Sequence, residues 1–418
     1  MKGFLSILAA LGLCLLPLPA QVSLPALDRQ LDRLGNQLFF ESPDGNVFLQ
    51  ASFQLDLWMH YADDNGGPPG FFFVSEGRDW EFSPRITGRF DAFFGEKLSL
   101  QSKIRWDDGV HPGVGAVYGD HTEIRVDELF FRWVAAPSAT IQIGQFTPVF
   151  GNFMSRQDSW EMGTVSYPMV YENVTSVTDQ LVPTNADAFA QRRKAPDNKK
   201  KWIPIIWAPL YTQGVSVFGA RENFQYSLNF TAHAPSSRGV VWNNIDFEYP
   251  TWSGRLGYQL GPQSTIGINA SQGPYFRTDA TNRLPGGTDP ADYLQSLLGL
   301  DFQWAHRDWE VWAELYLNRF EIPNSEDNAD SLSYYLEVRR QLAPKWWIAA
   351  RWNQELHSKI NTSSGPQDWD NDAYRVDLAL GHRFIRHGQF KLQYSYQDQD
   401  APFQNGRHFL VTEFTLRL

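Results

Sequence analysis

The sequence predicts an all-β protein, a transmembrane antiparallel β-barrel of sixteen strands with a short N-terminal helix. Three observations lead to this prediction. Apolar and polar residues alternate along sixteen segments, charged residues gather on one face of these segments, and the connections alternate between short and long. Alternation with a period of two residues is typical of a strand with one apolar and one polar face.

Residues 1–20 have the features of a secretory signal peptide. Lys2 precedes an apolar stretch of thirteen residues, Phe4 to Leu16, and Ala20 offers a small residue before a cleavage site. The stretch is shorter than the roughly 20 apolar residues that a membrane-spanning helix needs. We therefore expect export and cleavage, and because Cys14 is the single cysteine, no disulfide in the exported chain.

Residues 21–45 are expected to form an N-terminal periplasmic segment with a short amphipathic helix. Leu27, Leu31, Leu34 and Leu38 recur at 4-3-4 spacing, which places them along one helical seam. Two alternatives fit this pattern: a short coiled coil between copies of the chain, or a helix that packs as a plug or linker.

Residues 46–418 are expected to form the barrel. In "VFLQASFQLDLWMHY", residues 47–61, every odd position is apolar, and the pattern recurs along the chain. Within 122–135 the apolar positions shift by one residue, which predicts a β-bulge near Asp127. We predict strands at 47–61, 80–94, 97–107, 122–135, 139–149, 211–220, 224–232, 251–260, 264–271, 297–306, 309–320, 331–341, 345–356, 372–384, 389–397 and 408–418.

The lengths of the connections indicate which ends of the strands face which side. Short turns such as 95–96 and 307–308 follow even-numbered strands, and long polar loops such as 62–79 and 150–210 follow odd-numbered ones. This segregation is typical of outer-membrane barrels, with short periplasmic turns and long extracellular loops. The barrel must close, because each unpaired backbone group in hydrocarbon costs several kcal/mol. Sixteen strands leave room for an aqueous channel.

Composition excludes several classes of protein. The net charge of −11 disfavours a nucleic-acid partner, which needs a basic surface. The aromatic content of 15% argues against a disordered chain. The sequence contains no Gly-x-Ser-x-Gly motif, and we expect no catalytic residues, no metal site and no cofactor.

The strand pattern together with "ATIQIGQFTPVFG", residues 139–151 ahead of the longest loop, resembles bacterial general porins and most closely the phosphate- and polyphosphate-selective anion porins. The resemblance implies a homotrimer in the outer membrane of a Gram-negative-type bacterium, passing small hydrophilic solutes through barrels narrowed by an inward-folded loop. It also implies contacts with outer-membrane lipid, lipopolysaccharide and the barrel assembly machinery. The C-terminal strand resembles an assembly signal but ends in Leu418, where an aromatic residue is commoner.

Ten charged residues are candidates for lining the pore. Arginine suits phosphate or carboxylate because its planar fork donates to two oxygens. The alternative is that these cations pair with acidic residues of the lumen. The candidates are Arg85, Arg89, Lys103, Arg105, Arg132, Arg255 and Arg351 on the polar strand faces, and Arg156, Asp158 and Glu161 at the start of loop 150–210. The basic residues Arg192, Arg193, Lys194, Lys199, Lys200 and Lys201 either enter the lumen or stay outside it.

The leading functional hypothesis is a passive diffusion channel. The alternative within transport is a porin specific for anions such as phosphate, or for sugars. A sugar pathway would use inward aromatic residues, for which the pattern offers Trp58, Phe93, Trp312, Tyr335 and Trp347. A barrel enzyme and a structural tether are further alternatives.

Overall fold

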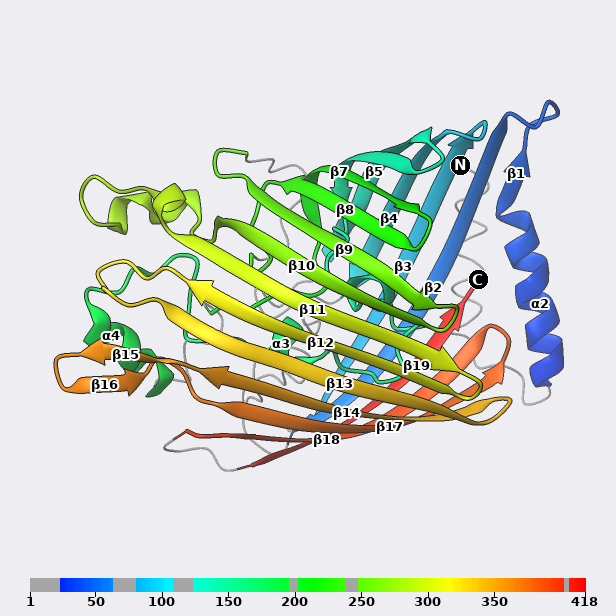
Figure 1. Cartoon of the computed structure of the whole chain (residues 1–418). Coiled ribbons are helices and arrows are strands. Elements are labelled where there is room, and N and C mark those ends of the chain that lie inside the picture. Colours follow the sequence, from blue (N-terminus) through cyan, green and yellow to red (C-terminus); the bar gives the residue numbers. More distant parts are fainter. Residues whose placement is uncertain (1–22, 63–79, 108–122, 195–201, 238–246, 402–405) are drawn as a thin grey trace.

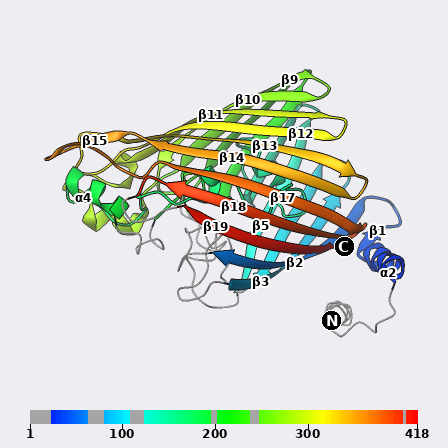
Figure 2. The same cartoon turned by 90° about the horizontal axis from the view of Figure 1, so that it is seen from below.

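The computed structural model describes residues 23–62, 80–107, 123–194, 202–237, 247–401 and 406–418. The predicted signal peptide, residues 1–20, and the basic residues Lys199, Lys200 and Lys201 lie outside the described residues. Figures 1 and 2 show a barrel of long tilted strands, with a helix beside one end and short helices at the other.

Sixteen strands of the described part form the barrel, and their bounds agree with the predicted ones within three residues. The fold class predicted from the sequence is therefore confirmed. The strands are β2 (Val47–Ala62), β3 (Trp80–Phe94), β4 (Leu98–Asp107), β5 (Glu123–Ala136), β6 (Ala139–Phe146), β7 (Thr212–Arg221), β8 (Phe224–Thr231), β9 (Thr251–Gly261), β10 (Ser264–Pro274), β11 (Leu294–His306), β12 (Trp309–Phe320), β13 (Ala329–Ala343), β14 (Trp346–His357), β17 (Ala373–Ile385), β18 (Gly388–Gln399) and β19 (Arg407–Arg417).

Each barrel strand pairs antiparallel with the next, and β19 pairs with β2 to close the cylinder. The closing register runs from Phe409 opposite Ala62 to Arg417 opposite Gln54. The short strand β1 (Phe39–Glu41) pairs with β2 over Phe48 to Gln50, beyond the point where β19 ends. Backbone groups at the start of β2 therefore have hydrogen-bond partners that β19 does not supply.

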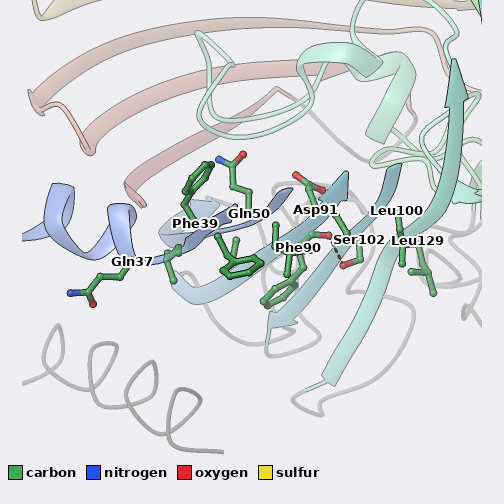
Figure 3. A pocket seen from close by; sticks show the side chains of 13 residues that line it. Gln37, Phe39, Gln50, Phe90, Asp91, Leu100, Ser102 and Leu129 are labelled. Atoms are coloured by element: carbon green, nitrogen blue, oxygen red, sulfur yellow. Dashed lines mark hydrogen bonds between the residues drawn. The ribbon is translucent and has the colours of Figure 1, made fainter. Parts of the chain in front are cut away.

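The two faces of the strands are chemically distinct, as the alternation predicts. Apolar side chains at the middle of the outer face, such as Leu300 and Leu336, are about half exposed, 50% and 47%. Figure 3 shows the alternation directly, because Gln50 and Asp91 project to one side of the strands and Phe90, Leu100 and Leu129 to the other. Exposed aromatic side chains stand near the strand ends, as interfacial girdles do; they include Trp80, Trp106, Trp133, Trp252, Trp309 and Trp346.

The predicted bulge in β5 is present. Lys103 of β4 pairs with Glu128, and the next residue, Ile104, pairs with Val126, so that Asp127 is the extra residue. The bulge keeps Ile124, which is 75% exposed, and Leu129 both on the outer face. The frame shift in the sequence is thus absorbed with the apolar positions on both sides of the bulge kept on the outer face.

Connections of two lengths separate the two ends of the barrel (Figure 1). At the loop end lie the hairpin of β15 (Lys359–Thr362) and β16 (Gly365–Asp368) and the helix α4 (Ala186–Ala190). At the turn end lies α2 (Leu24–Gln37), which is the predicted amphipathic helix. No helix among the described residues is long and apolar enough to cross a membrane.

Helix α2 packs on the rim of its own barrel. Its Asp32 carboxylate lies 2.8 Å from Nη2 of Arg386 and 2.9 Å from Nε2 of His387, in the turn between β17 and β18. The backbone N–H of Arg386 donates to Asp28, one helical turn earlier. Leu31, from the predicted seam, is buried. Helix α2 therefore packs against the turn between β17 and β18 of its own chain.

Candidate functional site

The long segment, residues 150–210, connects β6 to β7 and contacts the polar faces of distant strands. Its second residue, Gly151, has φ +69°, and a Cβ atom there would lie 2.4 Å from the Tyr316 hydroxyl. Only glycine tolerates both this conformation and this approach. The Gly151 N–H donates to Asn269 of β10 at 2.7 Å, and the N–H groups of Asn152 and Phe153 donate to Glu314 of β12 at 2.5 and 2.9 Å.

Further hydrogen bonds join the long segment to strands all the way round to β2. The Val165 N–H donates to Gln393 of β18 at 2.6 Å, and the Met169 N–H, at the start of α3 (Met169–Glu172), donates to Asn353 of β14 at 3.1 Å. The Ser159 hydroxyl donates to Asp56 of β2 at 2.7 Å. The partners are side chains of the polar strand faces, so the described parts of the segment lie against the interior wall.

Buried ion pairs reinforce these hydrogen bonds. Arg351 lies between Glu337 and Asp377, at 3.1 and 2.9 Å, and Arg375 lies between Asp377 and Glu172, at 3.0 and 2.5 Å. Burial raises the pKa of Glu172 in α3, and the Arg375 guanidinium opposes that effect. Each of the five charged groups in this network has at least one partner of opposite charge, which offsets the cost of burying it.

Apolar packing completes the contact between the long segment and the wall. Phe153 and Tyr171 of the segment lie in one buried cluster with Trp312, Tyr316 and Tyr335 of β12 and β13. A second cluster, nearer the loop end, joins Phe189 to Trp369, with the rings stacked at 5.9 Å. Residues of the long segment and inward side chains of β12 and β13 are therefore buried against one another.

This packing changes the interpretation of the inward aromatic residues. Trp58, Trp312, Tyr335 and Trp347 are all less than 8% exposed. The indole N–H of Trp347, for example, donates to the Gly163 carbonyl at 3.1 Å. The alternative of a sugar track needs open inward aromatic residues, and the long segment covers these four of its five residues.

On the other side of the interior lies a hollow of about 360 Å³, here called the charged hollow. Its walls are β3 to β7, residues 147–149 and the first part of the long segment. The lining residues are Arg89, Gln101, Lys103, Glu128, Phe130, Arg132, Gln142, Phe146, Thr147, Pro148, Val149, Phe150, Gly151, Met154, Ser155, Gln157, Asp158 and Phe218.

Asp158 connects the long segment to the opposite wall at this hollow. Its carboxylate accepts from Lys103 Nζ at 2.7 Å and pairs with Arg89. Burial alone raises the pKa of a carboxyl, but the charges of Lys103 and Arg89 outweigh it and hold the pKa of Asp158 well below its ordinary value of 3.8. Asp158 is therefore an anion throughout the neutral and mildly acidic range.

Arg132 differs from the other cations of the charged hollow. Its Nη2 donates to the Gln142 amide oxygen at 2.9 Å, and its guanidinium carbon lies 5.1 Å from the Phe130 ring centre and 5.6 Å from that of Phe218. Within the described part of the chain it makes no ion pair with a carboxylate, whereas Arg89 pairs with both Asp158 and Glu128.

The structure brings four of the ten candidate residues to the charged hollow: Arg89, Lys103, Arg132 and Asp158. The other six lie elsewhere, in ion pairs. Arg105 lies 3.2 Å from Asp107 and Arg85 3.8 Å from it, Arg255 lies 2.7 Å from Asp301, Arg156 lies 2.9 Å from Glu337, Arg351 lies in the buried network, and Glu161 lies 3.3 Å from Arg417. Five of these six are arginines paired with acidic residues, which is the arrangement that the alternative predicts.

Several lining residues were not among the candidates. Phe130, Gln142 and Phe218 surround Arg132, and all three lie on the face opposite to apolar outer positions such as Leu129 and Ile143. Alternation alone therefore assigns them inward, but it does not indicate that they meet. No group of three or more His, Cys, Asp or Glu side chains in the described ranges is placed to hold a metal ion.

A second hollow, of about 440 Å³, lies on the outer face of β2 to β5 and under β1 (Figure 3). Phe90, Leu100 and Leu129 line it together with Leu38 and Phe39. Its apolar lining continues the outer face, so this hollow is separate from the interior.

Comparison with known proteins gives structural neighbours alone. No family model matches the chain, and no curated protein sequence matches it. Among solved structures, DcaP, an outer membrane channel of Acinetobacter baumannii, has a TM-score of 0.56 at 9% identity, over 90% of this chain and 99% of that one. An anion-selective porin from Comamonas acidovorans has a TM-score of 0.54 at 10% identity, over 89% and 100%. OmpT of Vibrio cholerae has a TM-score of 0.54 at 12% identity, over 91% of this chain and 100% of that one. At these identities the likeness establishes a porin-type barrel fold.

Proposed function

We propose that the chain is an outer-membrane porin, a passive diffusion channel for small hydrophilic solutes and ions. The observation that carries the proposal is the charged hollow inside a closed barrel with an apolar outer face. A charged, wet lining inside such a barrel is what an aqueous pore needs and what a lipid-filled interior cannot tolerate.

The pore is narrowed by the long segment, folded inward against one side of the barrel. Three kinds of contact support this: hydrogen bonds from Gly151 and Val165 to β10 and β18, the ion pair of Arg156 with β13, and the apolar cluster around Phe153. Because the segment fills the interior beside β11 to β14, the solute path runs along β3 to β7.

Anion preference is a second candidate within the same function. The charged hollow is lined by three cations, Arg89, Lys103 and Arg132, and by two carboxylates, Glu128 and Asp158, which leaves one positive charge in excess. A small excess of fixed charge in a narrow passage biases permeation toward ions of opposite sign.

A pair of cysteine variants at adjacent positions tests the solute path. Gln101 lines the charged hollow, whereas Ser102 lines the hollow of the outer face. The single cysteine of the sequence is Cys14, within the predicted signal peptide, so an introduced thiol is the one reactive site in the processed protein. Each variant, Gln101→Cys and Ser102→Cys, is placed in a planar bilayer and exposed to a cationic and an anionic thiol reagent.

We expect the current through Q101C channels to change in opposite directions with the two reagents, and the current through S102C channels to stay constant. Equal responses of both variants, or no response of Q101C, would place the path elsewhere. Absence of any conductance from the folded wild-type protein would overturn the proposal of a pore.

We also propose the homotrimer that the resemblance to porins implies. The apolar outer face along β2 to β5 is compatible with a partner of equal polarity as well as with lipid. Mass measurement of the detergent-solubilised protein, corrected for bound detergent, distinguishes three copies from one.

A further inference from the structure

Arg132 differs from Arg89 and Lys103, the other two cations of the charged hollow, in its partners. It lacks an ion pair among the described residues, and its guanidinium lies close to two phenylalanine rings. Like Arg89, it is partly exposed. The Gln142 oxygen accepts from Nη2 and lies 3.3 Å from Nε, and within the described part of the chain Nη1 makes no hydrogen bond. A guanidinium has five N–H donors, so this one retains donors for a further acceptor.

The charges around Arg132 favour an acceptor with one negative charge. Arg89 and Lys103 are already engaged by Asp158, and Arg89 lies 3.7 Å from Glu128 as well. Among the residues that line the hollow, cations outnumber carboxylates by one, and the Asp91 carboxylate also attracts Arg132 from outside the lining. A doubly charged oxyanion would gain one partner in Arg132 and meet the field of two carboxylates, so phosphate is disfavoured relative to a monoanion.

The rest of the lining favours an apolar body attached to that charge. Phe130 and Phe218 flank the guanidinium, and Phe146, Phe150 and Met154 line the remainder of the hollow. Aromatic rings and a methionine provide dispersion contacts and edge-to-face partners for a flat ring. A volume of about 360 Å³ lies at the lower end of the roughly 300–1,000 Å³ that small-molecule pockets span.

We propose that the charged hollow is a binding subsite for aromatic monocarboxylates on the solute path, with Arg132 donating to the carboxylate and the phenylalanine rings contacting the ring. The proposal rests on the proposed function, since the subsite lies in the pore that the long segment leaves open. A solute bound there transiently obstructs the flow of small ions.

The experiment measures potassium chloride current through the wild-type protein in a planar bilayer while benzoate is added. Benzamide has the same ring without the charge, and inorganic phosphate has charge without the ring. We expect benzoate to reduce the current in a saturable manner, and benzamide and phosphate to do so at least about tenfold more weakly, because each lacks one of the two contacts.

Two matched arginine variants locate the effect. Arg383 also lies over an aromatic ring, with its guanidinium 4.8 Å from the centre of Trp160, but it does not line the charged hollow. We expect Arg132→Gln to raise the benzoate concentration needed for half-block about tenfold or more, and Arg383→Gln to leave it unchanged. Arg132→Lys keeps the charge without the planar fork, and we expect it to fall between wild type and R132Q.

The outcomes separate the two proposals. A wild-type protein that folds and never conducts overturns the proposed function. A conducting protein on which benzoate has no effect, on which phosphate acts more strongly than benzoate, or in which R132Q and R383Q respond alike overturns the subsite and leaves the pore intact. If R132Q does not assemble, the comparison of R132K with wild type decides the question.

Discussion

The guanidinium of Arg156 donates to the carboxylate of Glu337 across 2.9 Å, which joins the long segment to β13 over a sequence separation of 181 residues. Glu337 also accepts from Arg351 at 3.1 Å, and neither Glu337 nor Arg351 is exposed by more than 1%. One carboxylate therefore holds two buried guanidinium groups, and the segment's position depends on it.

Glu337→Gln is expected to destabilise the folded barrel by about 3–5 kcal/mol, because it leaves buried positive charge with too few partners. Urea titration of the detergent-solubilised protein, followed by gel mobility, measures this loss. The matched control is Asp330→Asn, which breaks the exposed pair of Asp330 with Arg319 and is expected to cost at most about 1 kcal/mol. Equal losses in the two variants would show that the buried network does not hold the segment.

The lowered pKa of Asp158 predicts that its ion pairs persist in mild acid. Because its pKa in the folded protein lies below the ordinary value of 3.8, its ion pairs with Lys103 and Arg89 are fully formed above that value and are lost only as pH falls through the lower folded-state pKa. We expect the open-channel current and ion selectivity to remain constant from pH 7 to about pH 4 as far as Asp158 is concerned.

Asp158→Asn removes the carboxylate at every pH, which leaves Lys103 without its ion pair and Arg89 with Glu128 alone. We expect the reversal potential in a potassium chloride gradient to move toward the chloride equilibrium potential, with a change in permeability ratio of about fivefold at most, since a unit charge 4 Å away is worth about 1 kcal/mol in water. A shift toward potassium would contradict this assignment.

An introduced charge is expected to destabilise the barrel more on the outer face than on the inner face. Leu300→Arg, at the middle of β11, is expected to cost about 2–4 kcal/mol in a lipid bilayer. Gln303→Arg, three residues along the same strand but on the opposite face, is expected to cost far less. The two are compared by refolding from urea into lipid vesicles, and similar losses would mean that β11 has no lipid face.

The bulge at Asp127 predicts that β5 tolerates a deletion that a regular strand does not. Removing Asp127 leaves Val126, Glu128 and Leu129 in regular alternation, so the outer face of β5 is preserved. Removing Ala313 from β12, which pairs without a register shift, turns every later side chain to the wrong face. Heat-modifiable gel mobility is expected to report a folded barrel for the first deletion and not for the second.

Much of this fold follows from sequence because a barrel wall between lipid and water imposes a two-residue period on every strand. The apolar residues of β4, Leu98, Leu100, Ile104 and Trp106, for example, mark its outer face without reference to any other strand. Even the bulge at Asp127 is visible, since it displaces the apolar positions around it. The strands that carry the pattern are the ones whose bounds were predicted within three residues.

The site was less predictable, because alternation says which face a side chain occupies and not which distant group it meets. Arg89 and Arg351 have the same local pattern, yet one lines the charged hollow and the other is buried between Glu337 and Asp377. The difference is made by where the long segment packs. That packing depends on neutral partners such as Asn353 and Gln393, which carry no distinctive signal in the sequence.

The pairing of β19 with β2 has a consequence for biogenesis. The first and last strands of the cylinder are direct neighbours, and the N–H of Leu418 donates to the Phe53 carbonyl at 2.8 Å. The pairing of β2 with β19 can therefore form only after β19 has been translated and exported. Until then the two edge strands of the growing sheet have unpaired backbone groups that need another hydrogen-bonding partner. In a chain truncated before β19 these groups would stay unpaired.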